Sequence, residues 1–307
     1  MSAAADEADE ICASCGIPAC DDITLKLCTA CKSVRYCGIE CQRKHRSQHK
    51  RACKKRAAEL RDEILFRQPE GTHFGDCPIC FIPISTGTDE DGNMNTAAHY
   101  PCCSKMICKG CIYESALQNT EEKCPFCRTP FPEGADTESM LKKREAANDP
   151  HAIRGVAGRF LKEGNFIECF KYMNQAAKGG HIDAHYQLAH MYVNGEGVEQ
   201  DMKKAFYHWE EAAIGGHHIA RFGLGLMEGN LGRHESQVKH LIIAANQGWG
   251  AAVEQLKMCY EEGHVSKDEF AAALRAYQRA IDATKSPQRE AAKRNPEFLN
   301  VKRGNNS

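Results

Sequence analysis

The chain has 307 residues, of which 42% are hydrophobic and 26% are charged, a composition typical of soluble globular proteins of about two domains. The formal net charge of -1 gives no overall attraction to nucleic acids or to membrane surfaces. The acidic start, MSAAADEADE, lacks the segments of a secretory signal, and no window reaches the roughly 20 apolar residues of a membrane span. We therefore expect a cytoplasmic or nuclear protein with no membrane partner, beginning with a disordered N-terminus over residues 1–11.

Cysteine is the outlying residue type, because 16 of the 18 cysteines lie between Cys12 and Cys127. In a reducing compartment, clustered thiols persist as free thiols or as metal thiolates, so zinc is favoured over a disulfide framework. Five CxxC pairs support zinc further. Thiolates three residues apart on a tight turn can share one tetrahedral ion at ~2.3 Å.

The first cluster offers eight candidate zinc ligands in four pairs, enough for two closed tetrahedral sites. The last two pairs are spaced four residues apart in GIECQRKHRSQHKRAC, which has no helix-breaking residue after Gly38, so a helix would place each pair on one face. His45 is a rival to His49, but only His49 stands four residues before Cys53. The expected ligands are Cys12, Cys15, Cys28, Cys31, Cys37, Cys41, His49 and Cys53.

This pattern resembles the MYND-type zinc finger over residues 12–53, including Tyr36 before the fifth ligand and Gln42 after the sixth. The resemblance implies that the ligand pairs interleave. One ion would be held by Cys12, Cys15, Cys37 and Cys41, and the other by Cys28, Cys31, His49 and Cys53. A segment of about 42 residues buries too little apolar surface to fold alone, so we expect the ions to supply much of its folding free energy.

Basic residues crowd the end of this segment, in RKHRSQHKRACKKR. They could mark a nuclear signal or a nucleic-acid contact. No stacking aromatic residues are interleaved, so we interpret them as the solvated face of the ligand helix, and nucleic acid is not an expected partner. Residues 54–72 follow as a linker that is helical as far as Pro69.

A second cluster, over residues 73–133, contains CPIC, then YPCCSKMICKGC, and finally CPFCR. It resembles a RING finger, whose fold cross-braces two ions. By that resemblance one site uses Cys77, Cys80, Cys108 and Cys111, and the other uses Cys124 and Cys127 with a middle pair. Lys105 stands where a usual RING has histidine. We expect Cys102 and Cys103 as the middle pair, with His99 as an alternative to Cys102. The two clusters together predict about four zinc ions, two per module.

The RING resemblance also implies a docking site for a ubiquitin-conjugating enzyme. Ile79, between the first two ligands, and Pro125, after the seventh, would form its apolar part. Arg128, directly after the last ligand, matches the family's linchpin arginine. RING ligases use no protein nucleophile and act by positioning the charged enzyme. The alternative is that Ile79 and Pro125 shape turns and that Arg128 is a solvated surface charge.

Self-similar segments follow at 176–184 (AAKGGHIDA), 212–220 (AAIGGHHIA) and 244–252 (AANQGWGAA), offset by 36 and then 32 residues. Periods of this size indicate stacked helix pairs. GEGVEQDMKKAFYHWEEAAIGGHHIA resembles the Sel-one-like repeat, a relative of the tetratricopeptide repeat, and the resemblance covers about residues 150–282. It implies protein binding on a concave face. We interpret the histidines that recur at the turns as framework residues, and residues 283–307 as a mobile basic tail.

The predicted fold class is small zinc-stabilised α+β modules at the N-terminus followed by an all-α helical-repeat solenoid. The expected function is a zinc-binding multidomain scaffold or adaptor, whose fingers and repeat groove dock partner proteins or peptides. The alternative is a RING-type ubiquitin ligase that recruits its substrate through the repeats, with a ubiquitin-conjugating enzyme as a partner. No nucleophile and base at recognisable spacing and no phosphate-binding loop are present, so the sequence leaves open whether the protein is an enzyme.

Overall fold

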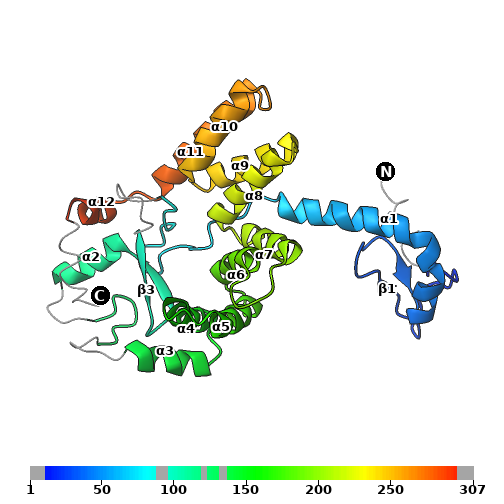
Figure 1. Ribbon diagram of the computed structural model, residues 1–307, viewed down its shortest axis with the longest axis horizontal. Coiled ribbons are helices and arrows are strands. Elements are labelled where there is room, and N and C mark those ends of the chain that lie inside the picture. The colour runs from blue at the N-terminus through cyan, green and yellow to red at the C-terminus, as the bar shows by residue number, and fades with distance from the viewer. Residues whose placement is uncertain (1–10, 88–95, 119–122, 131–136, 296–307) are drawn as a thin grey trace. The chain divides into compact units, whose positions relative to one another are not determined.

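The computed structural model describes residues 11–87, 96–118, 123–130 and 137–295 (Figure 1). The chain divides into two compact units, Met1–Arg67 and Gln68–Ser307. Apart from Ile11, the N-terminus that we expect to be disordered, residues 1–11, lies outside the described residues.

The first unit is a small finger followed by a long helix. Strands β1 (Lys26–Leu27) and β2 (Arg35–Tyr36) pair antiparallel, with Lys26 opposite Tyr36. The buried residues of the finger are few and include three cysteines: Cys12, Leu25, Cys28, Cys31 and Tyr36. A core of this size needs cross-links to hold its fold.

Helix α1 (Ile39–Leu65) begins after Gly38 and has 27 residues, which corresponds to a length of about 40 Å. The linker that we expect over residues 54–72 is therefore helical to Leu65, as a direct continuation of the ligand helix. No proline or glycine interrupts the segment from Ile39 to Leu65, so nothing ends the helix earlier.

The second unit begins with another small finger. Strands β3 (Ala97–Tyr100) and β4 (Lys105–Cys108) form an antiparallel hairpin, and helix α2 (Lys109–Gln118) follows directly. Ile84 and Ile107 are buried among the cysteines of this finger. As in the first finger, the apolar core is small.

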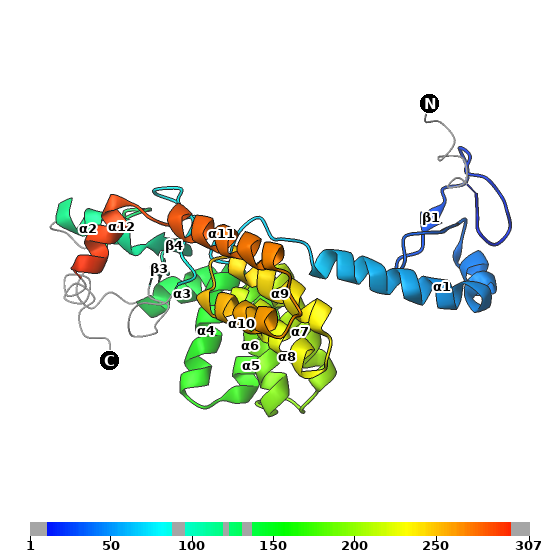
Figure 2. The same cartoon turned by 90° about the horizontal axis from the view of Figure 1, so that it is seen from above.

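A helical array makes up most of the second unit. Helices α4 to α11 pack in successive pairs, α4 with α5, α6 with α7, α8 with α9, and α10 with α11 (Figures 1 and 2). The helices are α3 (Thr137–Ala146), α4 (Pro150–Lys162), α5 (Phe166–Lys178), α6 (Ile182–Asn194), α7 (Met202–Ile214), α8 (His218–Asn230), α9 (His234–Asn246), α10 (Gly250–Glu261) and α11 (Lys267–Ala283).

Small residues set the close packing of the array. Ala184, Ala212 and Ala220 are fully buried where neighbouring helices meet. Gly180 and Gly216 end helix pairs with φ of 89° and 87°, left-handed values that strain other residues. The tight reversals between repeat units therefore depend on glycine at these two positions.

The C-terminal end departs from the expectation of a mobile basic tail over residues 283–307. Residues Pro287–Arg294 form helix α12, which Ser286 caps and which packs against α2. A Ser-Pro start and the small residue Ala292, which is buried, give this short basic segment a helical face that can pack. Residues 296–307 lie outside the described residues.

The fold class is as the sequence predicts, with small cysteine-rich α+β modules followed by an all-α helical-repeat solenoid. None of the helices in the described ranges combines the length and the apolar composition of a bilayer-spanning segment.

Candidate metal centres

Four of the CxxC pairs form the same local turn. In each, the backbone N–H of the residue after the second cysteine donates to the carbonyl oxygen of the first, at 2.8 to 3.0 Å. That closing residue has a left-handed φ of 56° to 73°. The closing residues are Gly16, Lys32, Phe81 and Arg128. A shared backbone geometry therefore presents each pair of sulfur atoms.

The structure brings the eight expected ligands of the first finger into two groups of four, and the ligand atoms of each group lie within 4.8 Å of one another. The groups are Cys12, Cys15, Cys37 and Cys41, and Cys28, Cys31, His49 and Cys53. Each group joins one CxxC turn to a pair spaced four residues apart, Cys37 and Cys41 at the start of α1 or His49 and Cys53 within it. The geometry is thus the interleaved arrangement that the MYND resemblance implies.

Two other side chains near these groups have different roles. His45, the rival to His49, forms a hydrogen bond with the Tyr36 hydroxyl at 3.1 Å through its Nδ1. His49 instead directs its Nε2 to within 3.3 Å of Cys31 Sγ. Cys20 is exposed and belongs to neither group.

The second finger also gathers its cysteines into two groups of four. The groups are Cys77, Cys80, Cys108 and Cys111, and Cys102, Cys103, Cys124 and Cys127. Cys102 rather than His99 completes the second group, since its Sγ lies 3.3 Å from that of Cys127. The ring of His99 stacks against His151 of α4, with centroids 5.7 Å apart.

The separations within the four groups fit zinc. A tetrahedral ion with Zn–S bonds of ~2.3 Å separates its sulfur ligands by ~3.8 Å. The recorded Sγ to Sγ distances are 3.3 to 3.8 Å. A disulfide would require ~2.05 Å, and the 18 cysteines are all free. Thiolates and imidazole are also the donors that zinc prefers in closed structural sites.

Hydrogen bonding and burial separate the pKa values of the thiols within one group. A hydrogen bond with the Cys108 thiol lowers the pKa of Cys77 to about 4. Burial raises the pKa of Cys111, in the same group, to about 12. The raised pKa of Cys111 disfavours a fourth thiolate in this group, and a divalent ion would supply the positive charge that deprotonates all four.

The residues expected to dock a conjugating enzyme lie at the turns of the second finger. Ile79 is 36% exposed despite being apolar, and Pro125 is half-buried. Arg128 is exposed and closes the last CxxC turn with φ of 59°. The backbone of Arg128 therefore helps to form the ligand turn, whatever its side chain contacts.

A contact with the C-terminal helix was not predicted from the sequence. Arg289 of α12 is 9% exposed and donates through Nη1 to the carbonyl of Pro83 at 2.6 Å and through Nη2 to that of Ile82 at 2.9 Å. A Cβ atom at Gly110 of α2 would lie 2.8 Å from Arg289, so glycine is needed there. No local pattern signals this contact, because about 200 residues separate its partners in the chain.

Histidines join the second finger to the repeat turns. His73 stacks on His217 with centroids 4.3 Å apart and lies 5.6 Å from His218. His217 caps α8 by accepting the N–H of Ala220 at its Nδ1. Burial lowers the pKa of His73 to about 3 and that of His218 to about 2, so these rings are neutral at pH 7. The geometry agrees with a framework role for these histidines. The turn before α8 is covered by His73 of the same chain.

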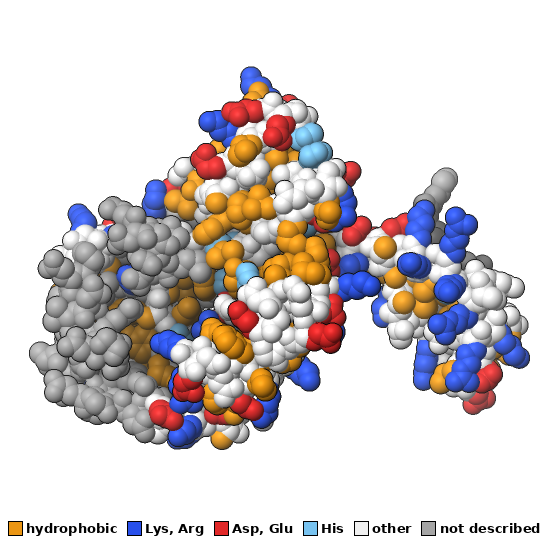
Figure 3. Space-filling view, in the orientation of Figure 1, with side chains coloured by type: hydrophobic (Ala, Val, Ile, Leu, Met, Phe, Trp, Pro, Cys, Tyr) orange, Lys and Arg blue, Asp and Glu red, His pale blue; other side chains and the backbone are white. Residues whose placement is uncertain are grey.

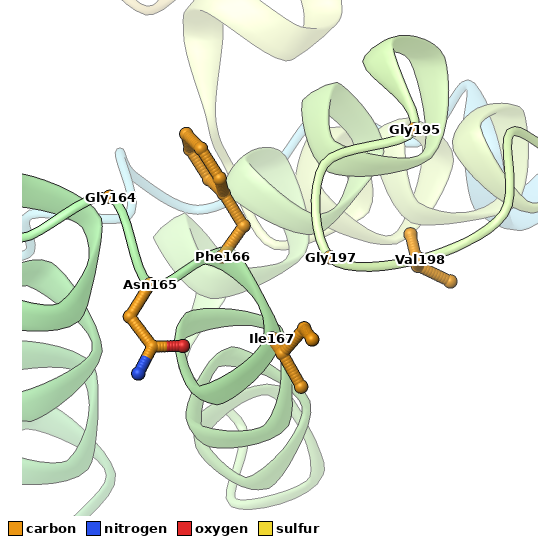
Figure 4. Close-up of a pocket in the computed structure, with 7 residues that line it drawn as sticks. All are labelled: Gly164, Asn165, Phe166, Ile167, Gly195, Gly197 and Val198. Atoms are coloured by element: carbon orange, nitrogen blue, oxygen red, sulfur yellow. The ribbon is translucent and has the colours of Figure 1, made fainter.

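An open pocket of about 470 Å³ lies at the turns of the first two helix pairs (Figure 4). Its walls are the start of α5, with Phe166 and Ile167, and the loop between α6 and α7, with Gly197 and Val198. A Cβ at Gly197 would lie 2.1 Å from the carbonyl oxygen of Phe166, so this close approach of the two turns requires glycine. Ile167 is 71% exposed at the rim.

Family comparisons identify two of the three regions. Residues 12–53 match the MYND finger. Residues 157–181, 182–217 and 251–284 match the Sel1 repeat, which agrees with the predicted array. The intervening helix pair, α8 and α9, has the shortened turn GNLGRHESQ. Neither of these two models includes residues 77–128 in its matched ranges.

Among individual proteins, chitin synthase regulatory factor 4 of Schizosaccharomyces pombe (strain 972 / ATCC 24843) is 33% identical over 159 residues, which cover 48% of this chain and 25% of that protein. The match thus spans a quarter of the relative's length. The solved c5321, a protective antigen present in uropathogenic Escherichia coli strains that displays an SLR fold, is 27% identical over 48% of this chain and 33% of its own, with a TM-score of 0.40. A Sel1 repeat protein from Oxalobacter formigenes is 23% identical over 51% of this chain and 64% of its own, with a TM-score of 0.39.

Proposed function

We propose that this protein is a zinc-dependent protein-interaction scaffold, in which two fingers bind four zinc ions and the repeat array docks partner proteins. One observation carries the proposal. Four groups of four cysteine or histidine ligands, each with its donor atoms within 4.8 Å, occur in a chain that also contains Sel1 repeats. A MYND finger joined to Sel1 repeats supports zinc binding and protein interaction.

The zinc part is tested by elemental analysis of the purified, reduced, full-length protein. We expect about four zinc ions per chain, and about three after Cys53→Ser. Cys20→Ser, which removes a thiol outside the groups, serves as the matched control and should keep all the zinc. A well-folded, reduced protein that contains essentially no metal would contradict the proposal.

The docking part is tested at the pocket of the repeat array. Ile167 offers an exposed apolar side chain at its rim, and a partner side chain can fill the space beside Val198. We expect Ile167→Asp to remove one or more proteins that co-purify with the wild-type chain. Leu231→Asp, at another exposed apolar position (58%), should leave the same proteins bound. Equal loss or equal retention in both variants would argue against docking at this pocket.

A second candidate function is a RING-type ubiquitin ligase, favoured by the exposed apolar side chains of Ile79 and Phe126 at the turns of the second finger. Apolar residues left exposed on two ligand turns offer a docking surface for a conjugating enzyme. The test is autoubiquitination with a panel of conjugating enzymes. Activity lost in Ile79→Ala and Arg128→Ala but kept in Leu231→Ala would establish the ligase. No activity with any member of the panel would rule out the ligase and leave the scaffold as the one proposed function.

A further inference from the structure

The first half of helix α1 is strongly cationic. Between Arg43 and Arg56 the chain has eight lysines and arginines and no aspartate or glutamate. In the space-filling view, blue side chains gather over this finger and its helix (Figure 3). The cationic residues are Arg43, Lys44, Arg46, Lys50, Arg51, Lys54, Lys55 and Arg56.

Seven of these cations share one side of α1. With 3.6 residues per turn, Arg43 to Lys55, leaving out Arg56, span about half of the helix circumference, opposite Cys41, His49 and Cys53. We call this side the cationic face, and all seven of its Lys and Arg residues are exposed. The zinc ligands hold the other side of the helix to the finger, so the cationic face points away from it.

Most of the cationic face has no acidic partner. Arg43 pairs with Glu40 at 3.0 Å, and Lys55 lies 3.9 Å from Glu59. The other five cations of the face form no ion pair with any described residue. The later part of the same helix is different, because Arg56 pairs with both Glu59 and Glu63. A face that served solubility alone would mix the two signs as this later part does.

The arrangement also opposes the stability of the helix. Arg46, Lys50 and Lys54 follow one another at intervals of four residues, and like charges at that spacing destabilise a helix. Cations stabilise the C-terminal turn of a helix, yet the last turn of α1 contains none. Helix formation therefore does not explain this face, and a bound anion would relieve the repulsion.

We propose that the cationic face of α1 docks an acidic segment of a partner protein, an inference that rests on the scaffold function proposed above. Three residues of the face, Arg46, Lys50 and Lys54, lie about 6.0 Å apart in rise along the helix. Alternate side chains of an extended peptide repeat at about 6.6 Å, so a segment with Asp or Glu at every second position can pair with all three cations. Each pair adds a modest amount, and several in series give a specific contact.

Two other anionic partners fit less well. A single-stranded nucleic acid is bound through stacking on aromatic rings, and the segment from Arg43 to Arg56 has none apart from its two histidines. A long nucleic-acid duplex would extend beyond the cationic face, and the chain as a whole, with a net charge of -1, does not attract it. A short acidic peptide lies within the screening length of the cationic face and experiences mainly its positive potential. An anionic membrane would require an apolar side on the helix, and that side holds the zinc ligands.

The experiment measures binding of a fluorescent peptide of about 12 residues, alternating Glu and Ser, to the full-length zinc-loaded protein. A Gln–Ser peptide is the uncharged control. We expect Lys50→Gln/Lys54→Gln to weaken binding about fivefold, and the matched pair Lys26→Gln/Lys257→Gln, two exposed lysines off the face, to leave it unchanged. Raising NaCl from about 50 to about 500 mM should weaken wild-type binding at least about tenfold.

Three outcomes would overturn the proposal: equal weakening by both pairs of substitutions, no saturable binding below about 1 mM peptide at about 50 mM NaCl, or tighter binding of a DNA duplex of about 20 base pairs. The zinc content of each variant separates this proposal from the scaffold function. If Lys50→Gln/Lys54→Gln keeps its zinc but binds the peptide as the wild type does, the docking face is contradicted and the scaffold function is not. Should Lys50→Gln/Lys54→Gln lose zinc, Arg46→Gln/Arg51→Gln tests the same face.

Discussion

Arg289, near the C-terminus, donates through Nη2 to the sulfur of Cys80, an expected zinc ligand, at 3.7 Å. The same guanidinium reaches the carbonyls of Ile82 and Pro83 just after that cysteine, and that of Thr284 on its own side. A cation next to four thiolates balances part of the negative charge of a Cys₄ site, and hydrogen bonds to ligand atoms tune such sites. The second finger is thus completed by α12.

Arg289→Ala should weaken the second unit by about 3 kcal/mol, because it removes the three hydrogen bonds that this buried guanidinium donates to the carbonyls of Ile82, Pro83 and Thr284. The measurement is urea unfolding of the full-length protein, followed by the fluorescence of Trp209 and Trp249, both in the second unit. Release of zinc to a colorimetric chelator should also become faster. Arg294→Ala, on the same helix but exposed, is the control. Equal zinc release from the two variants would show that the contact does not support the metal site.

Phe81→Gly should stabilise the second finger by about 1 kcal/mol, because Phe81 closes a CxxC turn at φ of 56°, where a side chain strains the backbone. The side chain is 77% exposed, so little packing is lost. Phe126→Gly, also at an exposed position but without a positive φ, should destabilise the finger instead. The resistance of zinc to a competing chelator measures both effects, and effects of the same sign would contradict this account.

The stability of the second unit should fall in acid through His218, which is fully buried. Burial holds its pKa at about 2, below the ordinary 6.5 of the unfolded chain, so the unfolded state binds the proton. The neutral ring's contribution to the free energy of unfolding is fully present above pH 6.5. It is lost progressively as the pH falls from 6.5 toward the folded-state pKa of about 2. Between pH 7.5 and 5.5 we expect a loss of about 1.4 kcal/mol from this ring alone.

His218→Phe keeps an aromatic ring and removes the titration, so its urea unfolding curves, measured with excess zinc, should depend less on pH over that interval. His264→Phe, at a partly exposed position near the array's far end, is the control. An unchanged pH dependence in His218→Phe would mean that the ring is solvated in the native protein.

Removal of zinc should expose the first finger to proteases. Its few buried residues include three of the ligands, so loss of the ion removes much of its core. Limited proteolysis with a chelator, or of Cys31→Ser, should cut within residues 12–53, while Cys20→Ser remains resistant with zinc. Resistance of the chelated wild-type finger would show that its fold does not need metal.

Local patterns predicted much of this molecule, because the features concerned are made by neighbours in the chain. CxxC spacing, the interval of four between His49 and Cys53, and the Gly-Gly-His turns each follow from the geometry of one turn or one helix face. The choice of Cys102 over His99 could not be settled in this way, since both lie in or beside the same hairpin and the stacking of His99 on His151, about 50 residues away in the chain, has no local signal.

The contacts that unite the second unit could not be predicted, because they join distant segments through side chains with no distinctive spacing. His73 gives no sign in the sequence that it stacks on His217, and Gly110 gives none that it makes room for Arg289. The basic composition of residues 283–307 suggested a tail, whereas Arg289 finds several acceptors on the second finger and Ala292 is buried in the docked helix.

The docking of α12 on the second finger also bears on how the protein is made. At about 5 to 20 residues per second, a ribosome needs roughly 10 to 40 s to add the 178 residues between Cys111 and Arg289. During that interval the nascent finger has its cysteines but lacks its guanidinium partner, so metal loading and cotranslational folding begin on an incomplete module. A truncation that removes α12 will therefore change the surroundings of Cys80, about 200 residues away in the chain.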